Sequence, residues 1–336
     1  MEERSFVDRT GVEVFTRWWA IDAPRGVVLI SHGASEHSGR YDRFAHALNS
    51  AGFAALALDH RGHGRTASAG QRGIMGPGGG RAVVDDLEEL RAAARSAAGI
   101  QGPAFLFGHS MGSLIGLAYL VDHSQDLAGG ILCGFPVSVD NVAAFRQLLQ
   151  AFADPNARDQ PAQDLLSSNN APFEPARTPF DWLSRDDNEV DRYIADPLCG
   201  DDNPLTYGYL LDLFDVVAPA RDHLASISCP VLVIAGDNDS AAGMGAHPSA
   251  LADAYEALLG AIFLDGGFEI ARTFILREFG GAFSGLSVIP TLDVIEYVRL
   301  GLLSCSIVFP FHPLPFQCRE EAFHNRIIPA IAFSAH

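Results

Sequence analysis

The sequence predicts an α/β fold in which a mostly parallel sheet carries helices on both faces. The first observation is a series of short, continuously apolar runs bounded by turn residues, a pattern typical of strands buried on both faces. The second is that amphipathic segments of helical period lie between several of these runs. The runs span residues 26–30, 53–58, 104–107, 130–133 and 230–235.

Helices are expected in the segments between these strands. Residues 41–51 and 81–97 each repeat apolar side chains at helical spacing, and the apolar segment 113–121 follows the strand at 104–107. Residues 136–222 break the alternation because they are polar and rich in Asp, Asn and Pro. A segment this long favours an inserted cap with its own helices over an irregular surface loop.

The charge of the chain excludes several classes of function. All 23 basic residues are Arg, so no lysine is available for a P-loop, a Schiff base or a Ser–Lys dyad. The net charge of −18 opposes attraction to nucleic acid, and no nucleic-acid partner is expected. The longest apolar run, 300–311, is too short to span a bilayer, and the charged start of the chain predicts no signal peptide.

Cysteine and histidine spacing gives no indication of a metal site. The 5 cysteines are odd in number and lack C-x-x-C spacing, which indicates reduced thiols in a cytoplasmic protein. His32, His60 and His63 with Asp59 have the composition of a ligand cluster, but their spacing matches neither H-x-H-x-D-H nor H-E-x-x-H. We therefore expect a polar loop here and no metal. The sequence does not indicate an oligomeric state.

The most specific motif is Gly108-His109-Ser110-Met111-Gly112, which matches G-x-S-x-G. An apolar strand precedes it and an apolar helix follows it, as expected where a nucleophilic serine lies on a tight strand-to-helix turn. Glycines are needed on both sides of this serine because the two backbones approach closely. Ser110 is therefore the candidate nucleophile, and the N–H of Met111 is a candidate donor to an oxyanion.

Two further segments follow strands that end at the same edge of the sheet. Residues 30–34 form a glycine-bearing loop, which either aims a second N–H at an oxyanion or is an ordinary strand–helix connection. Asp237 and Asp239 follow the strand at 230–235. An acid at this position fits the chain order Ser…Asp…His, and Asp239 is preferred over Asp237.

Four segments together resemble the monoacylglycerol lipase and lysophospholipase branch of the α/β-hydrolase superfamily. They are HGASEHSGRY, DHRGHGRT, GHSMGS and PVLVIAGDND, in the family's order, and the resemblance covers about residues 10–245. The resemblance implies that Ser110 is the nucleophile, Asp239 the triad acid, and the N–H groups of Ala34 and Met111 the oxyanion hole. It also implies an α/β-hydrolase fold with a helical cap, a small-molecule acyl ester or lipid substrate, and no cofactor.

The chain departs from that family where the catalytic base is expected. The family carries a turn of Gly-x-x-His-Glu type, whereas this chain reads Asp-Gly-Gly-Phe-Glu at 265–269 and has no His from 248 to 311. Glu269, at the position of the family's His, is a poor base because a carboxylate is far less basic than imidazole. The other candidates are His247, His312, His324 and His336, and none is expected to complete the triad. We therefore expect impaired activity, because a serine without its base loses most of its rate enhancement.

Residues 248–279 resemble instead the second acidic helix region of bacterial ribonuclease III. Asp253 and Glu256 match two metal-binding carboxylates of that family. Its first acidic signature is missing here, and half of a two-metal site cannot hold its metals. We therefore expect no metal site, with Asp253 and Glu256 a remnant on the solvated face of a helix that continues through 261–265.

The expected domain organisation has three parts. Residues 1–245 form the hydrolase core with a cap at about 136–222, residues 246–282 form the ribonuclease III-like fragment, and residues 283–336 form an unassigned apolar tail. The changes in composition indicate a chimeric C-terminus. The leading function is a serine carboxylester hydrolase. The alternatives are a non-catalytic protein that binds an acyl ligand under its cap and, more remotely, ribonuclease III-like RNA processing.

Overall fold

The computed structural model describes residues 1–97, 100–136, 142–150, 157–162 and 168–234. The chain divides into two compact units, and all of the described residues except Ile234 belong to the first. The description below concerns this first unit.

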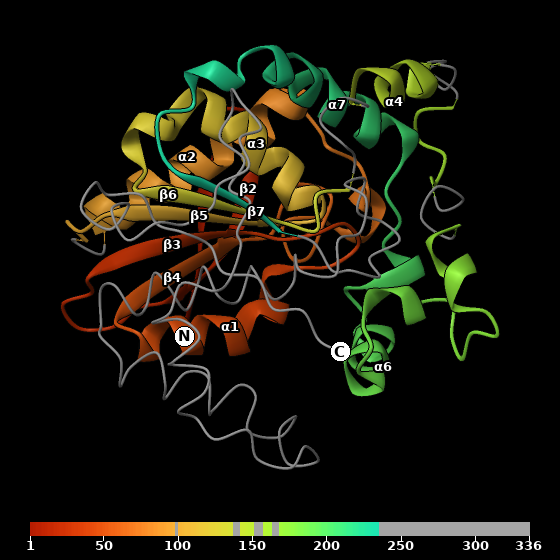
Figure 1. The fold of residues 1–336 in the computed structure, drawn as a ribbon, viewed down its shortest axis with the longest axis horizontal. Coiled ribbons are helices and arrows are strands. Elements are labelled where there is room, and N and C mark those ends of the chain that lie inside the picture. Colours follow the sequence, from red (N-terminus) through yellow and green to blue (C-terminus); the bar gives the residue numbers. More distant parts are fainter. Residues whose placement is uncertain (98–99, 137–141, 151–156, 163–167, 235–336) are drawn as a thin grey trace, which may run out of the picture. The chain divides into compact units, whose positions relative to one another are not determined.

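A seven-stranded sheet forms the centre of the fold, with the strand order β1-β2-β4-β3-β5-β6-β7 (Figure 1). β3 pairs in parallel with β4 and β5, and β5 pairs in parallel with β6. Each of the apolar runs in the sequence forms one of the strands from β3 to β7, so the prediction of a mostly parallel sheet is confirmed. The strands are β1 (Glu2–Val7), β2 (Glu13–Trp19), β3 (Gly26–Ser31), β4 (Phe53–Leu58), β5 (Ala104–His109), β6 (Gly129–Cys133) and β7 (Val231–Ile234).

The first two strands, β1 and β2, were not among those predicted. β1 pairs antiparallel with β2, and β2 pairs antiparallel with β4. β1 lies at the edge of the sheet and alternates exposed with half-buried side chains, so it lacks the continuous apolarity of the parallel strands. Its charged side chains still contact the sheet, because the guanidinium carbon of Arg4 lies 4.1 Å from the centre of the Trp18 ring.

Helices cover both faces of the sheet. Figure 1 shows α2, α3 and α7 on one face and α1 on the other. The α-helices are α1 (Asp42–Ser50), α2 (Gly79–Ala97), α3 (Met111–His123), α4 (Val142–Leu149), α6 (Asp187–Ala195) and α7 (Tyr207–Asp222). The 3-10 helices are η1 (Ser38–Tyr41), η2 (Ala69–Gln71), η3 (Ser124–Asp126), η5 (Ser168–Phe173), η6 (Asp181–Leu183), η7 (Gly200–Asp202) and η8 (Leu224–Ser226).

Alternate residues of each central strand pack into two separate cores. In β3, Leu29 contributes to the larger core beneath α2, α3 and α7, whereas Ile30 contributes to the smaller core beneath α1. In β4, Leu56 and Ala57 divide in the same way. This division explains why the strands read as continuous apolar runs, since neither face of the sheet is open to water.

The segment expected to form the cap contains α4, α6 and α7. α7 packs against α2, α3 and α4 and so lies on the larger core, whereas α6 packs beside η6. Among the described helices, none combines the length and apolarity that crossing a membrane requires.

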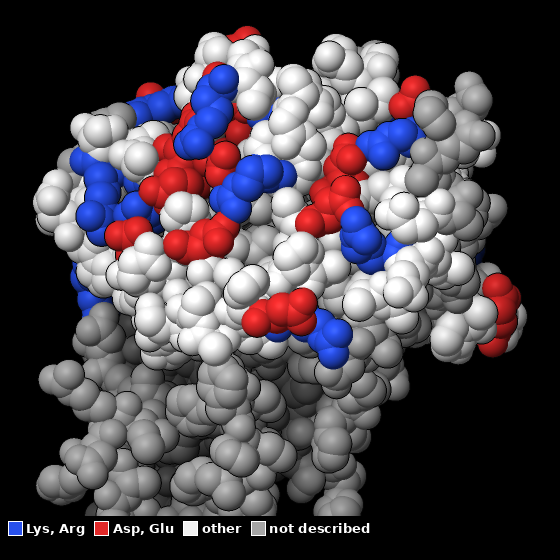
Figure 2. Space-filling model, turned by 90° about the horizontal axis from the view of Figure 1, so that it is seen from above, with Lys and Arg blue, Asp and Glu red and all other residues white. Residues whose placement is uncertain are grey.

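The face that carries α7 shows Arg and acidic side chains interspersed (Figure 2). Ion pairs join Arg146 to Asp215 at 2.5 Å and Arg158 to Asp212 at 2.7 Å. The arginines of this face are thus partly neutralised by carboxylates beside them.

Removing a central core side chain tests the two-faced packing of the sheet. Leu56 is fully buried and its backbone lies between Leu29 of β3 and Trp18 of β2. We expect Leu56→Ala to lower the free energy of unfolding by about 3 kcal/mol, because the truncation leaves a cavity that the strands cannot close. Urea denaturation measures this change. The matched control is Val7→Ala at a side chain that is 68% exposed, where a loss as large as that at Leu56 would contradict the packing.

Candidate active site

Ser110 occupies a strained turn between β5 and α3. Its backbone has φ 52° and ψ −119°, a left-handed conformation that side-chain-bearing residues rarely adopt. The Ser110 N–H donates to the carbonyl of Cys133 at the end of β6, at 2.8 Å. The side chain is half-buried, at the end of a parallel strand. This geometry is that of a nucleophile elbow, as the G-x-S-x-G motif predicts.

The glycines of the motif are required by close backbone contacts. A Cβ atom on Gly108 would lie 2.4 Å from the carbonyl oxygen of Gly112, and one on Gly112 would lie 2.1 Å from the carbonyl oxygen of Ser31. The first contact brings strand and helix together, and the second brings the helix against the end of β3. The motif therefore fixes the elbow against the loop that follows β3.

That loop is held by the buried carboxylate of Glu36. Its Oε1 accepts the N–H of Gly33 at 2.6 Å and the hydroxyl of Tyr41 at 2.8 Å, and its Oε2 accepts from Nε of Arg40 at 3.0 Å. Nδ1 of His109, on the elbow itself, lies 3.3 Å from Oε1. Glu36 thus connects the loop to the residue that precedes the candidate nucleophile.

The charge of Glu36 is stabilised by these contacts. Burial by itself raises the pKa of this carboxyl, but the hydrogen bond and charge of His109, together with the charge of Arg40, outweigh it and hold the pKa well below its ordinary value. Glu36 is therefore ionised at neutral pH and accepts hydrogen bonds with both oxygens.

The structure places Ala34 and Met111 on adjacent segments. A Cβ on Gly33, the residue before Ala34, would lie 3.3 Å from Cβ of Ser110, so the loop lies directly against the elbow. Ala34 is half-buried and Met111 is buried at the first position of α3. Their roles as oxyanion donors remain a prediction.

The three histidines beside this loop pack against one another and hydrogen-bond to backbone groups and to a serine hydroxyl. Nε2 of His32 accepts the N–H of His60 at 2.9 Å, so its Nδ1 carries the proton and donates to the carbonyl of Gly33 at 2.7 Å. Nε2 of His60 lies 2.8 Å from the hydroxyl of Ser31. Burial lowers the pKa of all three imidazoles, that of His63 to about 3, so they are neutral and connect the loops after β3 and β4.

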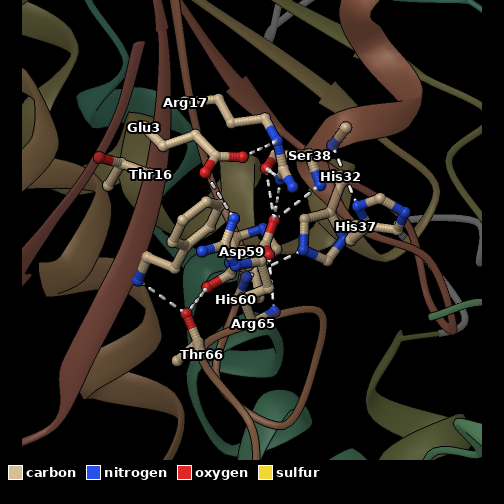
Figure 3. A network of polar contacts seen from close by, with 12 residues as sticks. Glu3, Thr16, Arg17, His32, His37, Ser38, Asp59, His60, Arg65 and Thr66 are labelled. Carbon is tan, nitrogen blue, oxygen red and sulfur yellow. Dashed lines mark hydrogen bonds and ion pairs between the residues drawn. The ribbon is translucent and has the colours of Figure 1, made fainter.

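Asp59, at the end of β4, is the centre of a second polar network (Figure 3). Its Oδ1 accepts the N–H of Ser38 at 2.9 Å and Nη1 of Arg17 at 3.1 Å, and its Oδ2 accepts the N–H of Arg65 at 2.7 Å. The hydroxyl of Ser38 also donates to Oδ1. Burial raises the pKa of this carboxyl, but these hydrogen bonds and the charge of Arg17 outweigh it and lower the pKa below its ordinary value.

Several predicted site residues lie outside the described residues. They are Asp237, Asp239, the carboxylates Asp253 and Glu256, the turn at 265–269 with Glu269, and the histidines His247, His312, His324 and His336. The expected helix at 261–265 lies there as well.

Sequence reasoning missed the supporting role of Glu36 and Asp59. Both stand inside the segments HGASEHSGRY and DHRGHGRT that carried the resemblance. The signal available was an acidic residue inside a motif that directly follows a buried strand.

A family model described as serine aminopeptidase, S33, matches residues 22–260. The chain belongs to this family. The α/β-hydrolase fold predicted from the sequence is thereby confirmed, and no comparison bears on the ribonuclease III-like resemblance, which stays a prediction.

Curated relatives of this S33-family protein include lipases. It is 31% identical over 245 residues to the monoacylglycerol lipase of Mycolicibacterium smegmatis, covering 70% of this chain and 79% of the relative. It is 28% identical over 240 residues to the monoglyceride lipase of Homo sapiens, covering 69% of this chain and 72% of the relative. A thermostable carboxyl esterase from Bacillus coagulans, solved in complex with glycerol, is 30% identical with a TM-score of 0.65, covering 73% of this chain and 83% of that one.

The close contact at Gly112 predicts a substitution that reverses the usual helix preference. Alanine normally stabilises a helix relative to glycine, but here its Cβ would overlap the Ser31 carbonyl. We expect Gly112→Ala to lower the free energy of unfolding by about 1–3 kcal/mol. The control is Gly70→Ala, where a Cβ would meet no atom within 4 Å. Equal urea midpoints for the two variants would contradict the close approach.

The lowered pKa of Asp59 predicts a pH-dependent loss of stability. Because the folded-state pKa lies below the ordinary value of 3.8, the ionised group stabilises the fold at higher pH, and this contribution is lost as the pH falls below that value. We expect Asp59→Asn to cost about 3 kcal/mol at pH 7, because Arg17 then lacks its buried partner. The difference in the free energy of unfolding between this variant and the wild type should be smaller at pH 3 than at pH 7, as measured by urea denaturation.

The exposed carboxylate of Asp22 provides the matched control for that measurement. Asp22→Asn should change the free energy of unfolding by less than about 0.5 kcal/mol at both pH values. A constant gap between Asp59→Asn and the wild type from pH 7 to pH 3 would show that ionisation of Asp59 does not stabilise the fold.

Proposed function

We propose that this chain is a serine carboxylester hydrolase of the monoacylglycerol lipase type, impaired in its base. The observation that carries the proposal is the elbow at Ser110, where a serine with φ 52° is held at the end of a parallel strand by glycine contacts. The strain of a positive φ in a non-glycine residue is characteristic of functional positions. Ala23 and Ser35 also have a positive φ, so what distinguishes Ser110 is the combination of this φ with the close glycine contacts at the end of β5.

In the proposed reaction, Oγ of Ser110 attacks the carbonyl carbon of an ester, and its proton passes to the alcohol that leaves. The N–H groups of Ala34 and Met111 donate to the oxyanion of the tetrahedral intermediate. Water then attacks the acyl-serine, which releases the fatty acid and restores the hydroxyl. By the resemblance, Asp239 corresponds to the acid that orients the imidazole base in active members of the family.

The relatives support an acyl ester with a glycerol-like alcohol as the substrate. Two of them are named as monoacylglycerol or monoglyceride lipases, and the esterase from Bacillus coagulans was solved with glycerol. The family description names an aminopeptidase, but none of these three proteins is named as one. We therefore propose esters, and not peptides, as the substrates of this chain.

The proposed catalytic residues include no imidazole base. The match to the family ends at residue 260, before the turn at 265–269 where the resemblance places the catalytic His. Hydrolysis without a positioned imidazole retains only the contributions of the oxyanion hole and substrate binding. We accordingly propose slow turnover.

The proposal includes the organisation of the whole chain. Residues 1–245 supply the hydrolase chemistry, with the cap at about 136–222 above Ser110, and residues 246–336 supply none of it. A cytoplasmic location is part of the same proposal, supported by the free thiols of Cys199 and Cys229. RNA processing is not proposed, because the net charge of −18 opposes it.

Labelling by a fluorophosphonate probe tests the nucleophile and the base together. We expect Ser110 to be labelled at least about 100-fold more slowly than the serine of a fully active monoacylglycerol lipase, because the probe requires an activated hydroxyl. Intact-protein mass spectrometry over time measures the rate. Ser110→Ala should abolish the adduct, whereas Ser96→Ala, at an exposed serine of α2, should keep it.

The outcomes separate the possible functions. Labelling of Ser110 at the rate of an active lipase would show that a base is present and that the expected impairment is wrong. Complete absence of an adduct, together with binding of a non-hydrolysable acyl ether, would replace the proposal by non-catalytic binding of an acyl ligand.

A further inference from the structure

Three potential metal ligands meet where the loop after β3 contacts the segment after α6. They are His37 on the loop, and Asp196 and Cys199 directly after the helix. One ligand atom from each lies within 4.8 Å of the other two, and Nε2 of His37 is 2.9 Å from Oδ2 of Asp196. Across the part of the chain that the structure describes, no other group of three or more His, Cys, Asp and Glu residues meets this spacing.

We infer that His37, Asp196 and Cys199 form a binding site for a divalent transition-metal ion of the zinc type. An imidazole nitrogen, a carboxylate oxygen and a thiolate sulfur are all ordinary zinc ligands. The thiolate favours zinc and related ions over magnesium or calcium, which prefer oxygen ligands alone. Three protein ligands leave a fourth tetrahedral position for water or another small ligand.

The ligands are already oriented by neighbouring groups. Oδ1 of Asp196 accepts the N–H of Leu198 at 2.9 Å, which leaves Oδ2 directed at His37. The N–H of Cys199 donates to the carbonyl of Asp196 at 3.0 Å, and its carbonyl accepts from the side chain of Asn203 at 2.9 Å. Such supporting hydrogen bonds are typical of metal sites because they fix the ligands before the ion arrives.

The charges balance when the ion binds. Burial raises the pKa of the Cys199 thiol, so this group stays protonated until an ion binds. Binding displaces the thiol proton to solvent, and the thiolate and the carboxylate of Asp196 together neutralise the two positive charges of the ion. Arg40 faces this cluster with a positive charge, but its Nε already donates to the carboxylate of Glu36 at 3.0 Å. The metal with its three ligands therefore has no net charge, and the ion pair between Arg40 and Glu36 beside it is kept.

Binding changes the tautomer of His37. In the metal-free arrangement Nδ1 accepts the N–H of Gly39 at 3.2 Å, so Nε2 carries the proton and donates to Asp196. With the ion on Nε2, the proton moves to Nδ1 and the imidazole stays neutral. Metal binding therefore removes the long hydrogen bond from the N–H of Gly39 to Nδ1. Gly39 is half-buried, so its N–H can bind water instead.

The bound ion would join two segments that already contact each other. The carbonyl of Ser35 accepts the N–H of Gly200 and the hydroxyl of Tyr193, both at 3.1 Å. The site lies beside these bonds, so the ion is expected to raise the midpoint of thermal unfolding. This inference is independent of the proposed ester hydrolysis, because neither Ser110 nor a base takes part in it.

Cobalt(II) titration of the full chain provides the test, because thiolate coordination to cobalt gives a charge-transfer band in the near ultraviolet. We expect a band that saturates at about one ion per chain and is removed by added zinc. Cys199→Ser should abolish the band, and Asp196→Asn and His37→Gln should weaken zinc binding by at least about tenfold. Thermal unfolding without metal checks that each variant is folded. If the Cys199→Ser variant is not folded, loss of zinc binding in Asp196→Asn decides the test.

The control variants keep the same residue types away from the cluster. They are Cys229→Ser, Asp191→Asn and His46→Gln, and each should bind both ions like the wild type. A cobalt band that persists in Cys199→Ser, or that disappears in Cys229→Ser, would assign the ion to other ligands and overturn the inference. Absence of a band and of any zinc-dependent rise in the unfolding midpoint of the wild type would overturn it as well.

Discussion

The close approach of three backbones around Ser110 is the constraint on which the rest of the site depends. β5, α3 and the end of β3 meet where Gly108 and Gly112 lack side chains, and the approach forces Ser110 into a left-handed conformation. The surrounding structure must supply enough stabilisation to maintain that strain. The two apolar cores supply it, because both faces of β3 and β5 are covered.

Buried charges near the elbow are held in place by paired contacts. Glu36 and Asp59 lie almost completely out of water, and each accepts at least one backbone N–H as well as an arginine. An unpaired carboxylate there would be strongly destabilising. The networks therefore define one arrangement of the loops after β3 and β4, which gives the backbone around Ala34 a fixed position against the elbow.

The parallel strands and the elbow were predictable because their signals are local. Continuous apolar runs indicated strands that are buried on both faces. The glycines around Ser110 indicated the close backbone contact directly. β1 was missed because an edge strand with alternating charged residues resembles a surface loop in sequence. The roles of Glu36 and Asp59 were missed because they depend on distant partners. Arg17, for example, lies 42 positions from Asp59 in the chain and meets it only after β2 pairs with β4.

The two hydrogen bonds to the Ser35 carbonyl have a consequence for how proteins of this design diverge. Tyr193 and Gly200 belong to the segment that differs most in character from the rest of the chain, yet they bond to the loop that carries Ala34. Replacing this segment would therefore also disturb the backbone beside the candidate nucleophile. Under the proposed function, in which this segment covers the acyl group, changes that preserve these two donors are the ones that alter substrate range without altering reactivity.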